Sequence, residues 1–291
     1  MNRTDAHHHV WDITLRRQPW MSEPGYEPMA RTFSAADHAV LAQAADVDAS
    51  VVVQCVSDEA ETYELLEIAR TDPVIVAVVG WVDLTAVDIA DRLGAMLAAP
   101  GGDCLRGIRH QVHDEADPDW LCRPDVLHGI RAVGAAGLVY ELLVKTPQLP
   151  AAIGAVGELP EVRFVVDHAA KPPIAAGARE PWSSLLALLA THANVTCKLS
   201  GLTTEANWQR WTDDDLQPWA TVILDAFGPA RVMAGSDWPV CTLAATYEAS
   251  LGVADRLTRH LTSAERTAVL DGTARSTYRL PARDEGIPRP I

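Results

Sequence analysis

The stretch Asp5-Ala6-His7-His8-His9-Val10-Trp11 is predicted to form the first β-strand of this chain. In a strand, side chains two positions apart point to the same face, so His7 and His9 project together while His8 points the other way. In a helix the same two side chains would diverge by about 200° around the axis. The two imidazoles therefore converge on one point. There they could hold a divalent metal through neutral nitrogens or donate hydrogen bonds to a developing oxyanion.

A polar tail or the relic of a histidine tag is the alternative interpretation of this stretch. Only three histidines occur in a row, and they lie between Asp5 and the apolar pair Val10-Trp11, which disfavours a tag.

Short apolar, β-branched runs recur along the 291 residues, and Ala- and Leu-rich stretches with helical spacing separate them. Strands are predicted at residues 5–10, 50–56, 74–82, 105–110, 138–144, 162–168, 194–200 and 231–237. Helices are predicted at residues 34–45, 59–70, 86–99, 124–136, 147–157, 182–191, 216–227 and 263–270.

Eight strands alternating with eight helices predict an α/β protein, one (β/α)8 TIM barrel domain over residues 1–291. A doubly wound open sheet is the alternative fold. It normally carries a glycine-rich phosphate turn after its first strand, which Val10-Trp11-Asp12 does not resemble. Residues 16–28 are expected to form a long loop. The proline-rich residues from about 281 to 291 are expected to form a tail, packed outside the barrel or partly disordered.

The formal net charge of −15 and the pI near 5.0 argue against nucleic acid or an anionic membrane surface as a partner. Five cysteines occur without a C-x-x-C pair, which is typical of reduced thiols in the cytosol. The N-terminus lacks an apolar signal region, and no apolar run reaches the roughly 18 residues that a transmembrane helix needs. We therefore expect a soluble, cytoplasmic protein. The sequence leaves its oligomeric state open, a homo-oligomer included.

Chemically capable side chains end several predicted strands, at the face where a barrel of this kind builds its active site. Arg109 ends the fourth strand, His168 the sixth and Asp237 the eighth. Taken singly, each has an ordinary alternative role. Arg109 could be an ion-pair partner, His168 a hydrogen-bonded core histidine and Asp237 a helix cap. With His7 and His9 they form a plausible hydrolytic site. In it an aspartate is the general base, histidines are electrophilic donors or metal ligands, and an arginine anchors an oxygen-rich substrate.

Nucleophilic catalysis has little support. No G-x-S-x-G elbow surrounds Ser236, and the cysteines lie in or beside apolar runs, where a structural role is the default. For Lys198, an ordinary position at the rim of the barrel is the alternative interpretation.

Several motifs along nearly the whole chain resemble the lactonase branch of the amidohydrolase superfamily (amidohydrolase 2). Among its members, the chain is most similar to enzymes of the L-fuconolactonase and L-rhamnonolactonase type. The H-x-H at the first strand and the motif at the eighth strand are the most specific. The matching segments are Asp5-Ala6-His7-His8-His9-Val10-Trp11-Asp12, Gln18-Pro19-Trp20-Met21, Gly107-Ile108-Arg109-His110, Asp117-Pro118-Asp119-Trp120-Leu121, Phe164-Val165-Val166-Asp167-His168, Lys171-Pro172-Pro173, Cys197-Lys198-Leu199-Ser200-Gly201-Leu202 and Gly235-Ser236-Asp237-Trp238-Pro239-Val240.

The resemblance implies a distorted barrel of the metallo-dependent hydrolase type and ring-opening hydrolysis of a lactone. Asp237 matches the base that deprotonates water. His7, His9 and His168 match the histidines that polarise the lactone carbonyl or, together with Asp237, bind metal. Arg109 and His110 stand where binuclear members place a bridging lysine or glutamate, so the resemblance implies at most one divalent ion. Zinc is the leading candidate. Because some lactonases of this branch work without a metal, a metal-free site is also compatible.

The expected substrate is a sugar lactone of the L-fucono-, L-galactono- or L-rhamnono- type. Arg109, Tyr140 and Trp208 are predicted to hold its hydroxyls and ring. The acidic surface and Glu205 favour a neutral aldonolactone over a dicarboxylate. The alternatives are a metal-dependent decarboxylase of the same superfamily, a pyrone-dicarboxylate-type lactonase, and a catalytically silent sugar-binding or scaffold protein. The complete set of three histidines and an aspartate disfavours the last of these.

Overall fold

The fold comes from a computed structural model that describes residues 3–281, except 17 and 23. Apart from Pro281, the expected C-terminal tail lies outside the described residues. No helix among the described residues is long and apolar enough to cross a bilayer.

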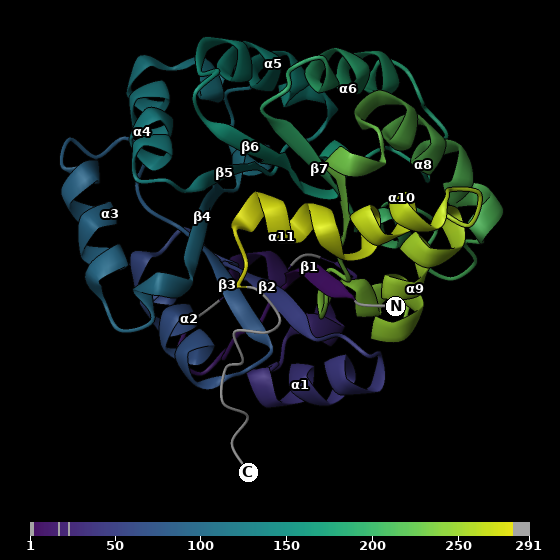
Figure 1. The fold of residues 1–291 in the computed structure, drawn as a ribbon, viewed down its shortest axis with the longest axis horizontal. Coiled ribbons are helices and arrows are strands. Elements are labelled where there is room, and N and C mark those ends of the chain that lie inside the picture. Colours follow the sequence, from purple (N-terminus) through teal and green to yellow (C-terminus); the bar gives the residue numbers. More distant parts are fainter. Residues whose placement is uncertain (1–2, 17, 23, 282–291) are drawn as a thin grey trace.

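Eight parallel strands form one sheet in sequence order, β1 to β8 (Figure 1). The sheet closes between its first and last strands, where His9 N–H donates to Trp238 O at 2.6 Å and Asp237 N–H donates to His7 O at 2.8 Å. The predicted (β/α)8 barrel is confirmed. The strands are β1 Thr4–His8, β2 Ala49–Val53, β3 Ile75–Gly80, β4 Leu105–His110, β5 Val139–Leu142, β6 Arg163–Val166, β7 Val195–Leu199 and β8 Val232–Ala234.

Helices surround the barrel as a ring (Figure 1). They are α1 Ala35–Ala44, α2 Glu59–Thr71, α3 Ile89–Ala98, α4 Pro124–Ala135, α5 Leu149–Glu158, α6 Trp182–Ala190, α7 Leu202–Glu205, α8 Asp213–Phe227, α9 Tyr247–Leu257, α10 Ser263–Thr267 and α11 Thr273–Tyr278. The predicted helices correspond to α1–α6, α8 and α10, whereas α7, α9 and α11 were not predicted.

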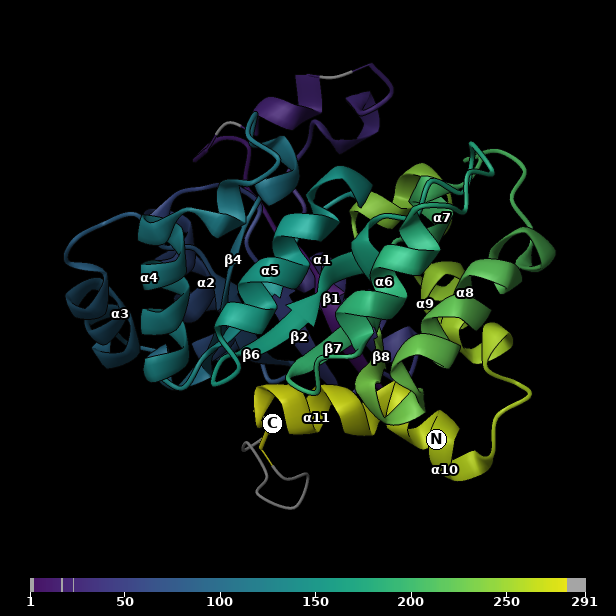
Figure 2. The ribbon, with the colours of Figure 1, turned by 90° about the horizontal axis from the view of Figure 1, so that it is seen from above.

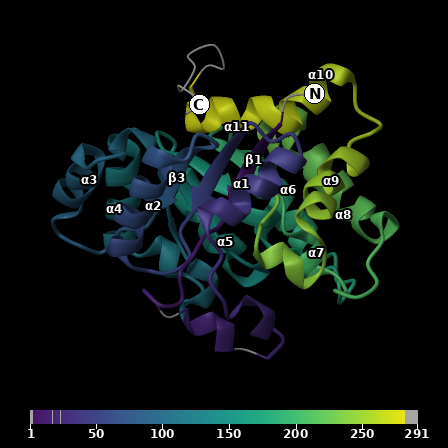
Figure 3. The same cartoon turned by 90° about the horizontal axis from the view of Figure 1, so that it is seen from below.

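The two ends of the barrel are covered differently. Helix α11 lies across the end where the strands begin, and the segment after β1 rises above the opposite end (Figures 2 and 3). That segment contains the short 3-10 helices Pro19–Ser22 and Glu27–Met29, so the loop expected at residues 16–28 is partly ordered. The end where the strands finish is therefore free of α11.

Side chains alternate between the barrel interior and the surrounding helices, as the strand period requires. The interior cluster gathers residues from most strands with two from α11: Ala6, Val51, Val53, Ala77, Val79, Val139, Val165, Met233, Ala274 and Tyr278. The outer core holds the alternate positions, among them Val52, Val78, Ile108, Leu142 and Phe164.

This alternation corrects the prediction for Tyr140. Its ring belongs to the outer core, is fully buried and packs edge-on against Phe164, with centroids 6.1 Å apart. Tyr140 therefore points away from the barrel interior, and its predicted contact with substrate is wrong. The neighbouring Glu141 faces the interior instead, where it reaches the ammonium of Lys198.

Candidate active site

The H-x-H stretch is arranged as the strand period requires. His7 is fully buried and His9 is 5% exposed, and their Nε2 atoms lie 3.1 Å apart. His8 is on the other face, where its ring stacks on His38 with centroids 3.7 Å apart. Burial is the main reason that the pKa of His7 lies well below its usual value, and Lys198 lowers it further. The His7 imidazole is therefore neutral at physiological pH.

Asp237, which follows the neighbouring strand β8, and His168, which follows β6, meet these histidines. Asp237 Oδ1 lies 3.5 Å from His9 Nε2 and 3.8 Å from His7 Nε2. It also lies 3.8 Å from His168 Nε2. Burial alone would raise the pKa of Asp237, but His168, His9 and Lys171 together hold it below its usual value. The site thus combines an ionised carboxylate with three imidazoles around one point.

The backbone around His168 is strained. Residues 168–171 all have positive φ angles between 49° and 61°, a region that side-chain-bearing residues rarely adopt and that is often found at active sites. His168 Nδ1 lies 2.9 Å from Ser200 Oγ, and burial lowers the pKa of this histidine to about 4. Gly201 is required beside it, because an added Cβ would lie 2.7 Å from His168 Nδ1. His168 is therefore held in one position as a neutral imidazole.

Arg109 lies at the floor of the pocket and is 3% exposed. Its guanidinium donates to Asp167 Oδ2 at 3.0 Å and to the carbonyl of Gln54. Its Nε is buried without a hydrogen-bond partner among the described residues. Arg109 is thus held by structural partners, while its buried Nε–H is left unpaired within the described part of the chain.

A buried ionic cluster beneath the histidines was not predicted. Lys198 Nζ donates to Glu141 Oε2 at 2.7 Å and forms an ion pair with Asp167 Oδ1 at 3.0 Å. Lys198 is fully buried inside the barrel, which excludes the alternative of a rim lysine. The signal was present in the sequence, because Lys198 and Glu141 each lie within a run that is otherwise apolar or uncharged.

Above the histidines lies a pocket of about 280 Å³. Trp11, Trp20 and Tyr26 form an aromatic wall on one side, each ring edge-on to the next. Trp208 lies behind this wall, with its ring 5.8 Å from that of Tyr26 and its Nε1 donating to Thr204 O at 2.8 Å. Trp208 therefore supports the wall and does not line the pocket, contrary to its predicted role.

The opposite side of the pocket is polar and carries more positive charge than the sequence suggested. Lys145 and Lys171 line it together with Arg109, and Glu205 Oε1 pairs with Lys171 Nζ at 3.0 Å. These cations come from loops, so strand periodicity did not reveal them. The other polar lining residues are Gln111, His113, Asp114 and Thr204.

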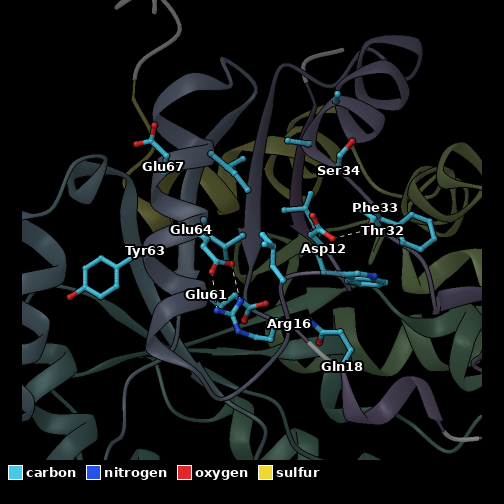
Figure 4. Close-up of a pocket in the computed structure, with 17 residues that line it drawn as sticks. Asp12, Arg16, Gln18, Thr32, Phe33, Ser34, Glu61, Tyr63, Glu64 and Glu67 are labelled. Carbon is cyan, nitrogen blue, oxygen red and sulfur yellow. Dashed lines mark hydrogen bonds and ion pairs between the residues drawn. The ribbon is translucent and has the colours of Figure 1, made fainter.

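A second, larger cavity of about 700 Å³ lies between the segment after β1 and helix α2 (Figure 4). Arg16 crosses it to pair with Glu64, and much of the remaining lining is apolar. Trp11 is shared with the aromatic wall, but no histidine lines this cavity. The site with catalytic side chains is therefore the smaller pocket.

The described residues fit one divalent ion. His7, His168 and Asp237 bring ligand atoms within 4.8 Å of one another, and these atoms are the nitrogen and oxygen donors that zinc accepts. His7, Glu141 and Asp167 form a second such group. However, Lys198 pairs with both of these carboxylates and Arg109 pairs with Asp167, so two positive charges already compensate them and leave none free for a second ion.

A parallel barrel with converging histidines and an aspartate at its strand ends defines a hydrolase-type site. The chain belongs to the amidohydrolase family, because the family model described as Amidohydrolase matches residues 4–280. It is similar to an L-fucono-1,5-lactonase of Burkholderia ambifaria, with 37% identity over 97% of this chain and 98% of the relative. An L-fucono-1,5-lactonase of Burkholderia multivorans is 38% identical over 96% of each chain.

The fold also matches a solved structure. The crystal structure of an amidohydrolase from Burkholderia multivorans with bound zinc superimposes with a TM-score of 0.90 at 37% identity, covering 97% of this chain and 100% of that one.

Proposed function

We propose that this chain hydrolyses a sugar lactone to the aldonate, with Asp237 as the base that deprotonates the attacking water. The position of the Asp237 carboxylate carries the proposal, because its Oδ1 lies within 3.8 Å of an Nε2 atom on each of three histidines. A water held by this carboxylate lies beside N–H donors that can receive the lactone carbonyl. Relatives 37–38% identical to this chain are L-fucono-1,5-lactonases, which supports the assignment.

The reaction begins when water attacks the lactone carbonyl and its proton passes to Asp237 Oδ1. This carboxylate is ionised because its pKa lies below its usual value. Negative charge then develops on the carbonyl oxygen, and imidazole N–H groups from His7 and His168 stabilise it. Collapse of the tetrahedral intermediate expels the ring oxygen, which leaves as an alcohol when it takes up the proton.

The same residues would hold a metal ion. His7, His9, His168 and Asp237 supply candidate ligands, and a divalent ion bound there would polarise the carbonyl and acidify water. A lactone is an activated ester, so a site made only of hydrogen-bond donors could also serve.

The pocket lining supports a sugar-sized substrate. The aromatic wall formed by Trp11, Trp20 and Tyr26 offers flat apolar surface to the C–H face of a sugar ring, whereas the opposite side offers polar groups for hydroxyls. We infer a neutral aldonolactone of the L-fucono-, L-galactono- or L-rhamnono- type.

One observation favours a second candidate, an anionic lactone such as a pyrone dicarboxylate. Arg109, Lys145 and Lys171 all line the pocket and could pair with carboxylates. Glu205 pairs with Lys171, which lowers the positive charge left for an anionic substrate.

Proton release tests the proposal. Purified protein is mixed with a panel of aldonolactones, a pyrone dicarboxylate and aromatic carboxylic acids in weakly buffered pH indicator. Lactone hydrolysis releases one proton per turnover, whereas decarboxylation does not. Acidification with an aldonolactone supports the proposal, and turnover of only the aromatic acids contradicts it.

A further inference from the structure

We propose that Lys198 fixes the tautomer of His7, so that His7 Nε2 carries a proton and acts as a hydrogen-bond donor instead of a metal ligand. The use of that proton in catalysis rests on the proposed function. The tautomer itself follows from hydrogen-bond directions alone.

The first constraint on the tautomer of His7 is its contact with Lys198. Its Nδ1 lies 3.0 Å from Lys198 Nζ, and both residues are fully buried. An ammonium group has three N–H donors and no acceptor, so Nδ1 must accept. A proton on Nδ1 would point at the N–H groups of Lys198. In a neutral imidazole the other nitrogen, Nε2, then carries the proton.

The second constraint comes from His9. Its Nδ1 lies 2.7 Å from Val53 O, which can only accept, so His9 carries its proton on Nδ1 and its Nε2 is bare. His9 Nε2 lies 3.1 Å from His7 Nε2, and a hydrogen bond between them needs one proton. Only His7 can supply it. The relay from Lys198 to His7 to His9 to Val53 therefore has a consistent direction at every step.

Two other contacts of His7 are weaker. Its Nδ1 lies 3.4 Å from Asp167 Oδ1, which is beyond the usual range for a proton donated in that direction. Arg109 Nη1 lies 3.3 Å from His7 Nε2, which is longer than the 3.1 Å from His7 Nε2 to His9 Nε2, and one of its two N–H groups donates to Asp167 Oδ2 at 3.0 Å. Neither contact outweighs the relay.

Zinc can bind His7 Nε2 only after that proton has left, so the contact with Lys198 weakens the one-ion site described above. His9 Nε2 is then an unprotonated nitrogen at the pocket, 3.5 Å from Asp237 Oδ1. His7 Nε2–H becomes a donor for the substrate carbonyl once substrate displaces His9 as its partner. Lys198 is thus a positioning residue, because it acts on the substrate only through His7.

Nitrogen NMR of histidine side chains tests the tautomer directly. We expect protein labelled with 15N-histidine to give a protonated-type Nε2 and a bare-type Nδ1 for His7, assigned by the signals lost in His7→Asn. In Lys198→Met this pattern should change, since the donor to Nδ1 is gone. A protonated Nδ1 in the wild type would overturn the proposal.

Zinc affinity provides the second readout. With His7 released, Lys198→Met should bind zinc at least tenfold more tightly in competition with a chelating indicator. Glu141→Gln is the matched control, because it alters the same buried cluster but leaves the ammonium at His7. We expect its zinc affinity within twofold of the wild type. Equal affinities of Lys198→Met and the wild type contradict the proposal.

Lys198→Met leaves two buried carboxylates without their cation and could fail to fold. The double variant Lys198→Met/Glu141→Gln carries one fewer buried carboxylate. It can be used in place of Lys198→Met in both measurements, with the same expected results. Neither measurement involves a lactone, so a wrong substrate assignment leaves both interpretable.

Discussion

Replacing Asp237 with asparagine should lower kcat at least a hundredfold while leaving the barrel folded. The amide keeps the shape of the carboxylate but cannot accept a proton from water. Positioned bases contribute about 10²- to 10⁴-fold to rate, so the lower bound corresponds to about 2.7 kcal/mol of transition-state stabilisation. Other carboxylates of the site cannot easily substitute, since Asp167 pairs with Arg109 and Glu205 pairs with Lys171.

Stopped-flow proton release with L-fuconolactone, together with thermal melting, measures both expectations. The backbone bond from Cys241 N–H to the Asp237 carbonyl stays in place, so the variant should remain folded and melt cooperatively. Asp114→Asn is the matched control: the same chemical change on the wall of the same pocket should cost less than about tenfold. Near-normal turnover of Asp237→Asn would refute the reasoning and leave His168 as the next candidate base.

Three further outcomes are expected. Burial raises the pKa of Glu61 to about 7, so the protein loses up to about 3 kcal/mol of folding stability from this group as pH rises from about 4.5 to 7. The unfolding free energy of Glu61→Gln, measured in urea, should therefore increase relative to that of the wild type between pH 5 and pH 8. A difference between the two proteins that does not change with pH would argue against this. The Tyr140 hydroxyl is buried without a partner among the described residues. Tyr140→Phe should therefore keep full activity and unfold at the same or a slightly higher urea concentration. A large fall in kcat/KM would instead support the predicted contact of Tyr140 with substrate. Elemental analysis after zinc loading and dialysis should give at most one equivalent per chain; two tightly held equivalents would contradict the one-ion site.

Strand positions and the convergence of His7 and His9 could be predicted because both depend on a local period. The predicted strands overlap the observed ones throughout, and β4 has the same bounds. Arg109, His168 and Asp237 meet at one mouth because parallel strands all finish at the same end of a barrel.

Within a uniformly apolar strand, it could not be predicted so readily which side chains point into the barrel and which point outward. The run at residues 138–144 has apolar side chains on both faces, so only Glu141 marks the interior side. Treating that charge as the inward position would have turned Tyr140 outward. Lys198 carries the same signal in β7, but a buried charge is costly unless it has a partner, and the sequence alone does not show which residue is the partner.

The rest of the pocket depends on loops whose course no periodicity determines. Lys145 and Lys171 follow strands, but their approach to the pocket depends on turns such as the left-handed residues 168–171. Trp208 follows β7 in the chain, and this predicts that it lies at the pocket. In the structure Tyr26, from the loop after β1, lines the pocket, and Trp208 packs against Tyr26.

The central claim is that this site opens a neutral sugar lactone, and a comparison of kcat/KM tests it most directly. Wild-type protein is assayed by proton release with L-fucono- or L-galactono-lactone and with the pyrone dicarboxylate, using Asp237→Asn as the blank. We expect the aldonolactone to be preferred and the blank to be nearly silent. A preference for the dicarboxylate by even tenfold, or equal proton release by Asp237→Asn, would contradict the account.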